Sequence, residues 1–227
     1  VKSESVINSS YNSRLDLYAE HVIRGDITTA DGTVLAKTTV NDDGSETREY
    51  PYGRMFAHVV GYTNNGKGGL ESQYNFNLLR SHSFFLTQII NDLKNKKNIG
   101  DTLVTTLDYD VQETAYKALG DRDGAVVMEV KTGKILALVS KPDFDPNTLA
   151  ERWDDIVSDE NSSVLLNRVT SGLYPPGSTF KIFTTLEYVH ENSNYQDYSF
   201  DCEGELNVDG NEIHCYHKAV HGKETLK

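Results

Sequence analysis

Hydrophobic residues fall into short runs in the first half of this chain and into longer, more regular patterns in the second half. Two apolar runs within residues 23–36 flank Asp31-Gly32, a dipeptide that favours positive φ and a tight turn, so this segment is predicted to be a β-hairpin. The run at residues 56–62 predicts another strand, and residues 84–93 predict one helical segment. Residues 1–107 are therefore expected to be mostly strand and loop.

A different pattern begins at Asp108. An aspartate can cap the start of a helix, and the apolar residues Val111, Ala115 and Leu119 then recur every four positions. This spacing places the three side chains on one face of a helix. We predict a helix over residues 108–119 and the start of a second domain at its first residue.

Two continuous apolar runs, at residues 124–130 and 135–139, are joined by a Lys-Thr-Gly-Lys segment. This pattern is typical of two buried antiparallel strands with a tight turn between them. Strands that are apolar on both faces need cover on both faces, and the helix at residues 108–119 and a helix from Ser178 onward are the candidates to supply it. The prediction for this part is an α+β layered domain.

Charge and composition exclude one class of partner. The chain has 227 residues with 22 Lys and Arg against 34 Asp and Glu, and its net charge of -12 would repel a phosphate backbone. Nucleic acid is therefore not expected to bind.

No stretch approaches the roughly 20 apolar residues of a membrane-spanning helix, and Val1-Lys2-Ser3-Glu4 is not the start of a signal peptide. An ectodomain cut from a membrane-anchored parent would have the same composition.

Cys202 and Cys215 bracket a polar, glycine-containing stretch that is predicted to be a hairpin or loop. Three states of this pair remain open: a disulfide in an oxidising compartment, two free thiols, or a zinc site that draws on His214, His217 or His221. The gap between the cysteines is longer than the close cysteine pair of common zinc fingers. A disulfide that staples an exposed loop is the state we expect.

The motif with the clearest chemistry is Ser178-Thr179-Phe180-Lys181, which follows a Pro-Pro-Gly turn and precedes an apolar segment with helical spacing. Residues three apart on a helix share a face, so the Lys181 amine can reach the Ser178 hydroxyl. A lysine that is kept neutral by desolvation can accept the serine proton during attack on a carbonyl. The motif thus predicts Ser178 as nucleophile and Lys181 as general base. The alternative is that Ser178 only caps the helix and Lys181 is solvated.

The residues around this motif resemble those of the class B penicillin-binding proteins. Six stretches carry the resemblance, in the order found in that family: Arg24-Gly25-Asp26-Ile27, Gly69-Leu70-Glu71, residues 105–112, residues 124–147, Leu166-Asn167-Arg168 and residues 174–181. The first two resemble the family's non-catalytic pedestal domain, and the others resemble the first helix, the strand pair with its loop and the active-serine region of its transpeptidase domain.

This resemblance implies a fold of class α+β. A β-rich, dimerisation-like pedestal domain would occupy residues 1–107, and residues 108–227 would form the first part of a penicillin-binding or transpeptidase-like domain, an antiparallel sheet flanked by helices. It also implies a peptidoglycan D,D-transpeptidase in which Ser178, assisted by Lys181, forms an acyl-enzyme with D-Ala-D-Ala stem peptides. β-Lactams would acylate the same serine, and no cofactor or metal would be required. Further implied partners are membrane proteins of cell division or elongation.

The sequence departs from the family pattern in its other motifs, because penicillin-binding proteins carry a Ser-x-Asn type triplet and a Lys-Thr-Gly in addition to Ser-x-x-Lys. No Ser-x-Asn follows Ser178, and Lys131-Thr132-Gly133 precedes the serine, so we interpret that tripeptide as a turn. The chain is therefore expected to lack a complete active site and to be weakly active or inactive alone. The parent protein is expected at the extracytoplasmic face of the cell membrane, anchored by an N-terminal helix that this chain lacks.

Three other functions remain as alternatives. A D,D-carboxypeptidase differs mainly in whether water or an amine takes the acyl group. A serine β-lactamase or β-lactam sensor shares the Ser-x-x-Lys motif, but the pedestal-like residues 1–107 argue against a free hydrolase, which needs no spacer. The third alternative is a pedestal or interaction fragment without activity of its own.

Overall fold

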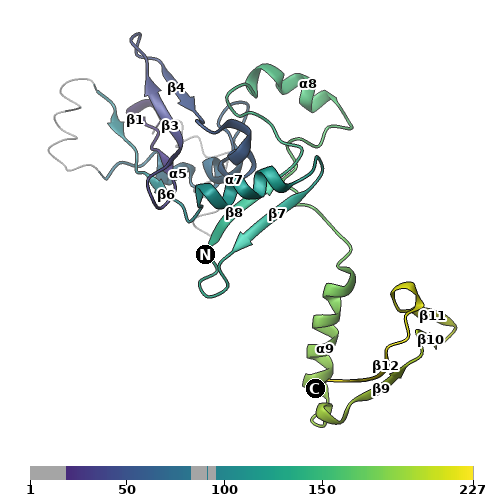
Figure 1. The fold of residues 1–227 in the computed structure, drawn as a ribbon. Coiled ribbons are helices and arrows are strands. Elements are labelled where there is room, and N and C mark those ends of the chain that lie inside the picture. The colour runs from purple at the N-terminus through teal and green to yellow at the C-terminus, as the bar shows by residue number, and fades with distance from the viewer. Residues whose placement is uncertain (1–18, 83–90, 92–95, 227) are drawn as a thin grey trace. The chain divides into compact units, whose positions relative to one another are not determined.

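The computed structural model describes residues 19–82, 91 and 96–226 (Figure 1). The chain divides into two compact units, Val1–Leu173 and Tyr174–Lys227. Apart from Asn91, the helix predicted at residues 84–93 lies outside the described residues. No helix in the described ranges is long and apolar enough to cross a membrane.

The first unit contains a four-stranded sheet in the order β4-β3-β2-β6. Its strands are β2 (Ile27–Thr28), β3 (Val34–Val40), β4 (Glu46–Glu49) and β6 (Leu103–Val104). Strand β3 pairs antiparallel with β2 and β4, and β6 pairs parallel with β2. The predicted hairpin is confirmed, with Gly32 in its turn at a φ of 91° that glycine adopts without strain. A short parallel pair joins β1 (Val22–Ile23) to β5 (Asn98–Ile99).

The strand predicted at residues 56–62 is wrong, because this segment is helical. A 3-10 helix at Gly53–Phe56 leads into α3 (Ala57–Val60), and Gly61 ends it at a φ of 90°. Phe56 and Val60, one helical turn apart, are both buried in the main core. A short apolar run does not distinguish a buried strand from a buried helix by periodicity alone.

The main core lies between the four-stranded sheet and the helices that follow it. Its buried side chains are Ile27, Leu35, Ala36, Tyr50, Phe56, Val60, Leu78 and Leu107. Helices α4 (Gly69–Gln73) and α5 (Asn75–Leu78) follow α3 in the sequence. Tyr109 and Ile135 pack against the same core. The predicted domain boundary at residue 108 stays a prediction, and residues on both sides of it contribute to this core.

The predicted helix after Asp108 is α7 (Tyr109–Ala118), and the Asp108 carboxylate accepts a hydrogen bond from the Val111 amide at 3.0 Å. The predicted strand pair is also present, as β7 (Gly124–Met128) and β8 (Ile135–Ser140) in antiparallel register. Helix α7 packs against β8 (Figure 1). The turn at residues 131–134 contains Gly133 at a φ of 73°, as expected for a turn.

The two strands of this pair are not equally buried, which corrects the prediction of two covered strands. Strand β8 buries Ala137 and Val139, whereas Val126 and Met128 of β7 are 48% and 55% exposed. Among the described residues the pair forms a two-stranded sheet. The apolar character of β7 is therefore not matched by packing partners in this structure. After β8, a loop buries Phe144 and Leu149 in a second small core, and α8 (Trp153–Ser158) follows.

The second unit begins with a 3-10 turn at Gly177–Thr179 that continues as α9 (Phe180–Glu191), so the predicted helix from Ser178 is confirmed. Four short strands follow, β9 (Ser199–Cys202), β10 (Glu205–Val208), β11 (Asn211–His214) and β12 (Gly222–Thr225). Strands β10 and β11 form an antiparallel hairpin between the two cysteines, and β9 pairs antiparallel with β12. The hairpin predicted for this stretch is confirmed.

Candidate active site

Ser178 lies in the 3-10 turn that opens α9, and Lys181 lies in the first turn of that helix. Gly177, just before the serine, has a φ of 53°, a conformation that favours glycine. The Thr179 hydroxyl and amide both donate to the Pro176 carbonyl, which fixes the turn. The Pro-Pro-Gly turn thus presents Ser178 where a helix starts, and the backbone N–H groups at a helix start favour developing negative charge.

Of the alternative interpretation, Ser178 does not cap the helix in this structure, whereas Lys181 is exposed, as that interpretation expected. The N-cap residue of α9 is Thr179, and no side chain caps either this helix or the 3-10 turn. Ser178 and Lys181 are both exposed, and within the described ranges no hydrogen bond joins their side chains. The spacing therefore places the two residues in neighbouring positions at the start of the helix, but their side chains do not form a hydrogen bond with each other in this structure.

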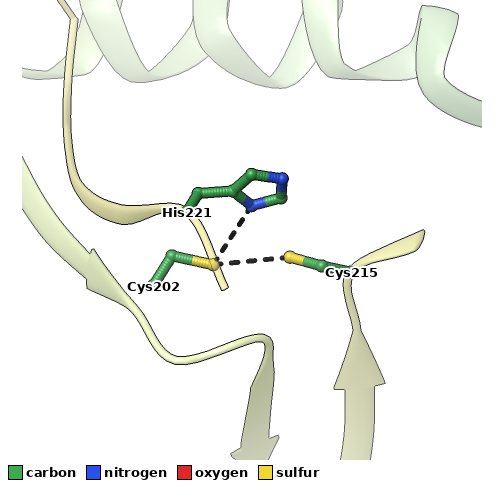
Figure 2. A group of neighbouring side chains, drawn as sticks. All are labelled: Cys202, Cys215 and His221. Carbon is green, nitrogen blue, oxygen red and sulfur yellow. Dashed lines mark hydrogen bonds between the residues drawn. The ribbon is translucent and has the colours of Figure 1, made fainter. Parts of the chain in front are cut away.

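Cys202, Cys215 and His221 form a cluster in the same unit (Figure 2). The two sulfurs lie 3.4 Å apart, and His221 Nδ1 lies 3.5 Å from the Cys202 sulfur. A disulfide has a sulfur separation of about 2.05 Å, so the structure describes two thiols. Cys202 is buried and Cys215 partly buried. The disulfide stays a prediction.

The surroundings shift the two thiols in opposite directions. Backbone N–H groups of His221 and Gly204, followed by the His221 side chain and Cys215, lower the pKa of Cys202 to about 7. The pKa of Cys215 is raised, mainly because its side chain shares a hydrogen bond with Cys202, and the positive charge of Lys181 opposes this shift. Cys202 is therefore the sulfur that the fold favours as a thiolate.

Of the three histidines considered with the cysteines, only His221 joins the cluster. His214 instead lies beside the carboxylates of Glu205 and Glu212, at 3.8 and 3.4 Å. His217 packs its ring edge-on against Tyr216, with 4.1 Å between the ring centroids. The sequence predicted that a histidine could join the two cysteines but did not indicate which of the three histidines it would be.

Sequence reasoning missed a buried charged network in the first unit. Glu71 of α4 is fully buried and accepts hydrogen bonds from Arg24 at 2.6 Å and Arg48 at 2.8 Å. Asn75 accepts a further hydrogen bond from Arg24, and the Tyr50 hydroxyl donates to Glu71 at 3.3 Å. The only available signal was a single acidic residue among the apolar and polar positions of a short helix, which is too common to indicate burial.

Two family models match the chain. The model described as the penicillin-binding protein A dimerisation domain matches residues 24–103, and the penicillin-binding protein transpeptidase domain matches residues 124–227. The chain belongs to the class B penicillin-binding proteins. The expected α+β fold, a pedestal or dimerisation domain followed by part of a transpeptidase domain, is confirmed.

Relatives of this penicillin-binding protein include two curated peptidoglycan D,D-transpeptidases. PbpA of Mycolicibacterium smegmatis is 36% identical over 190 residues, which cover 75% of this chain and 38% of the relative. MrdA of Acinetobacter baumannii is 32% identical over 176 residues, which cover 63% of this chain and 26% of the relative. The chain thus spans less than half the length of these curated relatives.

Solved structures agree with this family membership. The imipenem acyl-enzyme complex of penicillin-binding protein A from M. tuberculosis matches with a TM-score of 0.78 and 27% identity, over 91% of this chain and 52% of that chain. The D,D-transpeptidase domain of a peptidoglycan glycosyltransferase from Eggerthella lenta matches with a TM-score of 0.75 and 33% identity, over 91% of this chain and 46% of that chain.

Proposed function

We propose that this protein is a peptidoglycan D,D-transpeptidase in which Ser178 forms the acyl-enzyme and Lys181 is the general base. The observation that carries the proposal is the position of both residues at the start of α9, inside the range matched by the transpeptidase model. Further support comes from penicillin-binding protein A of M. tuberculosis, whose structures are described as acyl-enzyme complexes with imipenem and penicillin G. The proposed substrates are D-Ala-D-Ala stem peptides, with β-lactams as inhibitors.

In the proposed reaction, the Ser178 hydroxyl oxygen attacks the carbonyl carbon of the penultimate D-alanine while the Lys181 amine accepts the hydroxyl proton. The oxyanion of the tetrahedral intermediate accepts a hydrogen bond from the Ser178 backbone N–H. Collapse of the intermediate breaks the peptide bond and releases the terminal D-alanine, which takes up a proton. The amine of a second stem peptide then attacks the acyl-enzyme and regenerates the Ser178 hydroxyl.

The general base must be deprotonated before it can act, which favours a site that removes Lys181 from water. Lys181 is exposed in this chain, and the family's Ser-x-Asn and Lys-Thr-Gly motifs do not occur after Ser178 in this sequence. We therefore propose that the 227-residue chain alone is acylated slowly. One missing oxyanion donor typically costs on the order of 100- to 1000-fold in rate.

Covalent labelling with a fluorescent penicillin, followed by mass spectrometry of the labelled peptide, tests the proposal on the natural full-length protein. Wild-type protein is expected to carry the label on Ser178, and Ser178→Ala is expected to remove it. Lys181→Ala should keep the fold but slow acylation by about 100-fold or more, because general-base assistance is worth roughly 100- to 10,000-fold.

Lys131→Ala is the matched control, because Lys131 belongs to the Lys-Thr-Gly tripeptide that precedes the serine and lies in an exposed turn. Its labelling rate should equal that of the wild type. Label that persists after Ser178→Ala would overturn the nucleophile assignment. Release of free D-alanine without a cross-linked product would favour the D,D-carboxypeptidase alternative over the transpeptidase.

The proposed substrate also implies a location and partners. Stem peptides of the cell wall lie outside the cell membrane, so the enzyme would act at its extracytoplasmic face. The proposed partners are membrane proteins of cell division or elongation.

A further inference from the structure

A cavity of about 250 Å³ lies in the first unit. Among its lining residues, Val22 and Leu79 are buried, whereas Asn64 and Lys67 are exposed, so core and surface side chains both form its wall. Ser178, the nucleophile of the proposed reaction, belongs to the second unit and does not line this cavity. The charged groups in the wall decide what the cavity can hold.

Two largely buried guanidinium groups, those of Arg24 and Arg48, belong to residues that line this cavity. They share one carboxylate, because Arg24 Nε donates to Glu71 Oε2 and Arg48 Nε donates to Glu71 Oε1. Arg24 donates from its other two nitrogens to the Asn75 side-chain oxygen and to the Glu71 carbonyl. All three guanidinium nitrogens of Arg24 therefore have an acceptor within the chain.

Arg48 differs from Arg24 because one of its guanidinium nitrogens has no acceptor. Its Nη1 donates to the Gly25 carbonyl at 2.8 Å and to the Thr38 hydroxyl at 3.0 Å. Its Nη2 is buried and has no hydrogen-bond partner among the described residues. A buried donor on a charged group is costly to leave unpaired, which points to an acceptor that comes from outside the chain.

The charges around the cavity are not balanced within the described part of the chain. The single carboxylate of Glu71 serves both guanidinium groups. Lys67 adds a further positive charge to the wall, and the acidic lining residue Glu46 already pairs with Lys97 at 2.6 Å. Burial lowers the pKa of Arg24, the charge of Glu71 opposes this shift, and the charge of the second guanidinium adds to it. The wall thus carries an excess of positive charge in a chain whose net charge is -12.

A carboxylate on a small organic ligand matches these features. Carboxylate oxygens accept charge-assisted hydrogen bonds from guanidinium N–H groups. The apolar side chains of Val22 and Leu79 can contact a short carbon chain, and the amides of Asn64 and Asn75 can bond to a peptide unit beside the carboxylate. Glu46 in the wall disfavours a doubly charged phosphate more than a singly charged carboxylate. The volume lies below the roughly 300–1,000 Å³ of drug-sized ligand sites, so the ligand is small.

We propose that this cavity binds a small carboxylate ligand of the N-acyl amino acid type, the chemical group found at the carboxyl end of a peptide. Arg48 Nη2 donates to the carboxylate, and Lys67 supplies positive charge at the exposed part of the wall. The bound ligand gives the buried donor its acceptor and thereby stabilises the first unit. The proposal does not depend on acyl transfer at Ser178.

Titration of the 227-residue chain with N-acetylglycine, followed by ¹H–¹⁵N NMR at constant ionic strength, tests the proposal. N-acetylglycinate carries both the carboxylate and a peptide unit, and N-acetylglycinamide is its uncharged isostere. The acid is expected to bind saturably with a Kd of about 1 mM. It should shift the side-chain Nε–H resonance of Arg48 and the backbone amide resonances of residues 63–67. The uncharged isostere should do neither.

Charge variants at the exposed part of the wall separate binding from folding, because they leave the buried network in place. Lys67→Ala should weaken binding of N-acetylglycinate by about 2- to 5-fold, and Glu46→Gln should strengthen it by a similar factor. Lys117→Ala is the matched control, since Lys117 is exposed and lies outside the cavity, and it should bind like the wild type. Arg48→Lys keeps the charge but removes Nη2, so it should weaken binding by about 10-fold or more.

Three outcomes would overturn the proposal. Equal binding of N-acetylglycinate and N-acetylglycinamide, or no saturable binding of either, would show that the cavity does not recognise a carboxylate. Equal affinities of Lys67→Ala and Lys117→Ala, in chains whose circular dichroism matches the wild type, would place the bound ligand elsewhere. Tighter binding of inorganic phosphate than of N-acetylglycinate would assign the cavity to a different class of anion.

Discussion

At the scale of single residues, the buried carboxylate of Glu71 organises the first unit. Its side chain is fully buried, and the Arg24 and Arg48 side chains are only 10% and 7% exposed. Burial lowers the pKa of Arg24, while the charge of Glu71 opposes that shift. Glu71 is thus the shared anionic partner of two largely buried guanidinium groups, so its loss would affect both.

Replacing Glu71 with alanine should therefore be strongly destabilising. The change leaves two largely buried positive charges without their partner, and breaking a buried ion pair typically costs about 3–5 kcal/mol. The free energy of unfolding, measured by urea denaturation, should fall by about this amount in Glu71→Ala. Glu49→Ala is the matched control, because Glu49 pairs with Lys37 on the surface, and its effect should be small. Equal effects of the two substitutions would contradict the assigned role.

At the scale of elements, Gln112 joins α7 to two other segments. Its side-chain amide donates to the Met55 and Leu138 carbonyls at 2.8 and 2.9 Å and accepts from the Leu138 amide at 2.9 Å. Gln112 is fully buried, whereas the apolar residues that marked this helix in the sequence are only partly buried. The helix was predictable from its cap and spacing, but its most buried contact is polar.

Gln112→Leu should destabilise the first unit although it makes the position more hydrophobic. Three buried backbone groups would lose their partner, and an unsatisfied buried group costs about 1–3 kcal/mol. Thermal unfolding followed by circular dichroism should show a clearly lower midpoint for this variant. Thr114→Leu, at an exposed position of the same helix, should leave the midpoint almost unchanged. A midpoint for Gln112→Leu equal to that of the wild type would show that water replaces these hydrogen bonds.

At the scale of the whole molecule, the chain consists of two compact units that meet in sequence at Leu173 and Tyr174. Both side chains at this junction are exposed, Leu173 to 97%. The sequence predicted a different division, after residue 107, with sparse contacts around residues 94–101. The two divisions make different expectations for proteolysis, because exposed segments between compact units are cleaved first.

Limited proteolysis distinguishes these divisions. Brief digestion with chymotrypsin is expected to cut after Leu173 and to leave a resistant fragment that ends there, identified by intact mass. Trypsin, which cleaves after Lys96 and Lys97, tests the division predicted from sequence. Rapid tryptic cutting in this segment with two stable products would support the earlier boundary, and its absence would count against it.

Local chemistry determined much of what the sequence predicted by itself. The Asp31-Gly32 turn, the Asp108 cap, the strand pair around residues 131–134 and the helix that begins at Ser178 each depend on residues close together in the chain. The Asp108 cap, the strand pair and the start of the Ser178 helix also lie in stretches that carried the resemblance to the penicillin-binding family. Turn residues, helix caps and the periodicity of hydrophobic residues act over a few positions in the chain, so no tertiary contact was needed to recognise them.

Only the tertiary structure decided the features that depend on distant partners. The apolar run after Gly53 becomes helical because Phe56 and Val60 meet the core from one face. Glu71 is buried because Arg24 and Arg48, 47 and 23 residues away in the chain, reach it. His221 is selected over His214 and His217 because the pairing of β9 with β12 brings it to Cys202. Burial and convergence are set by long-range packing, which local periodicity does not encode.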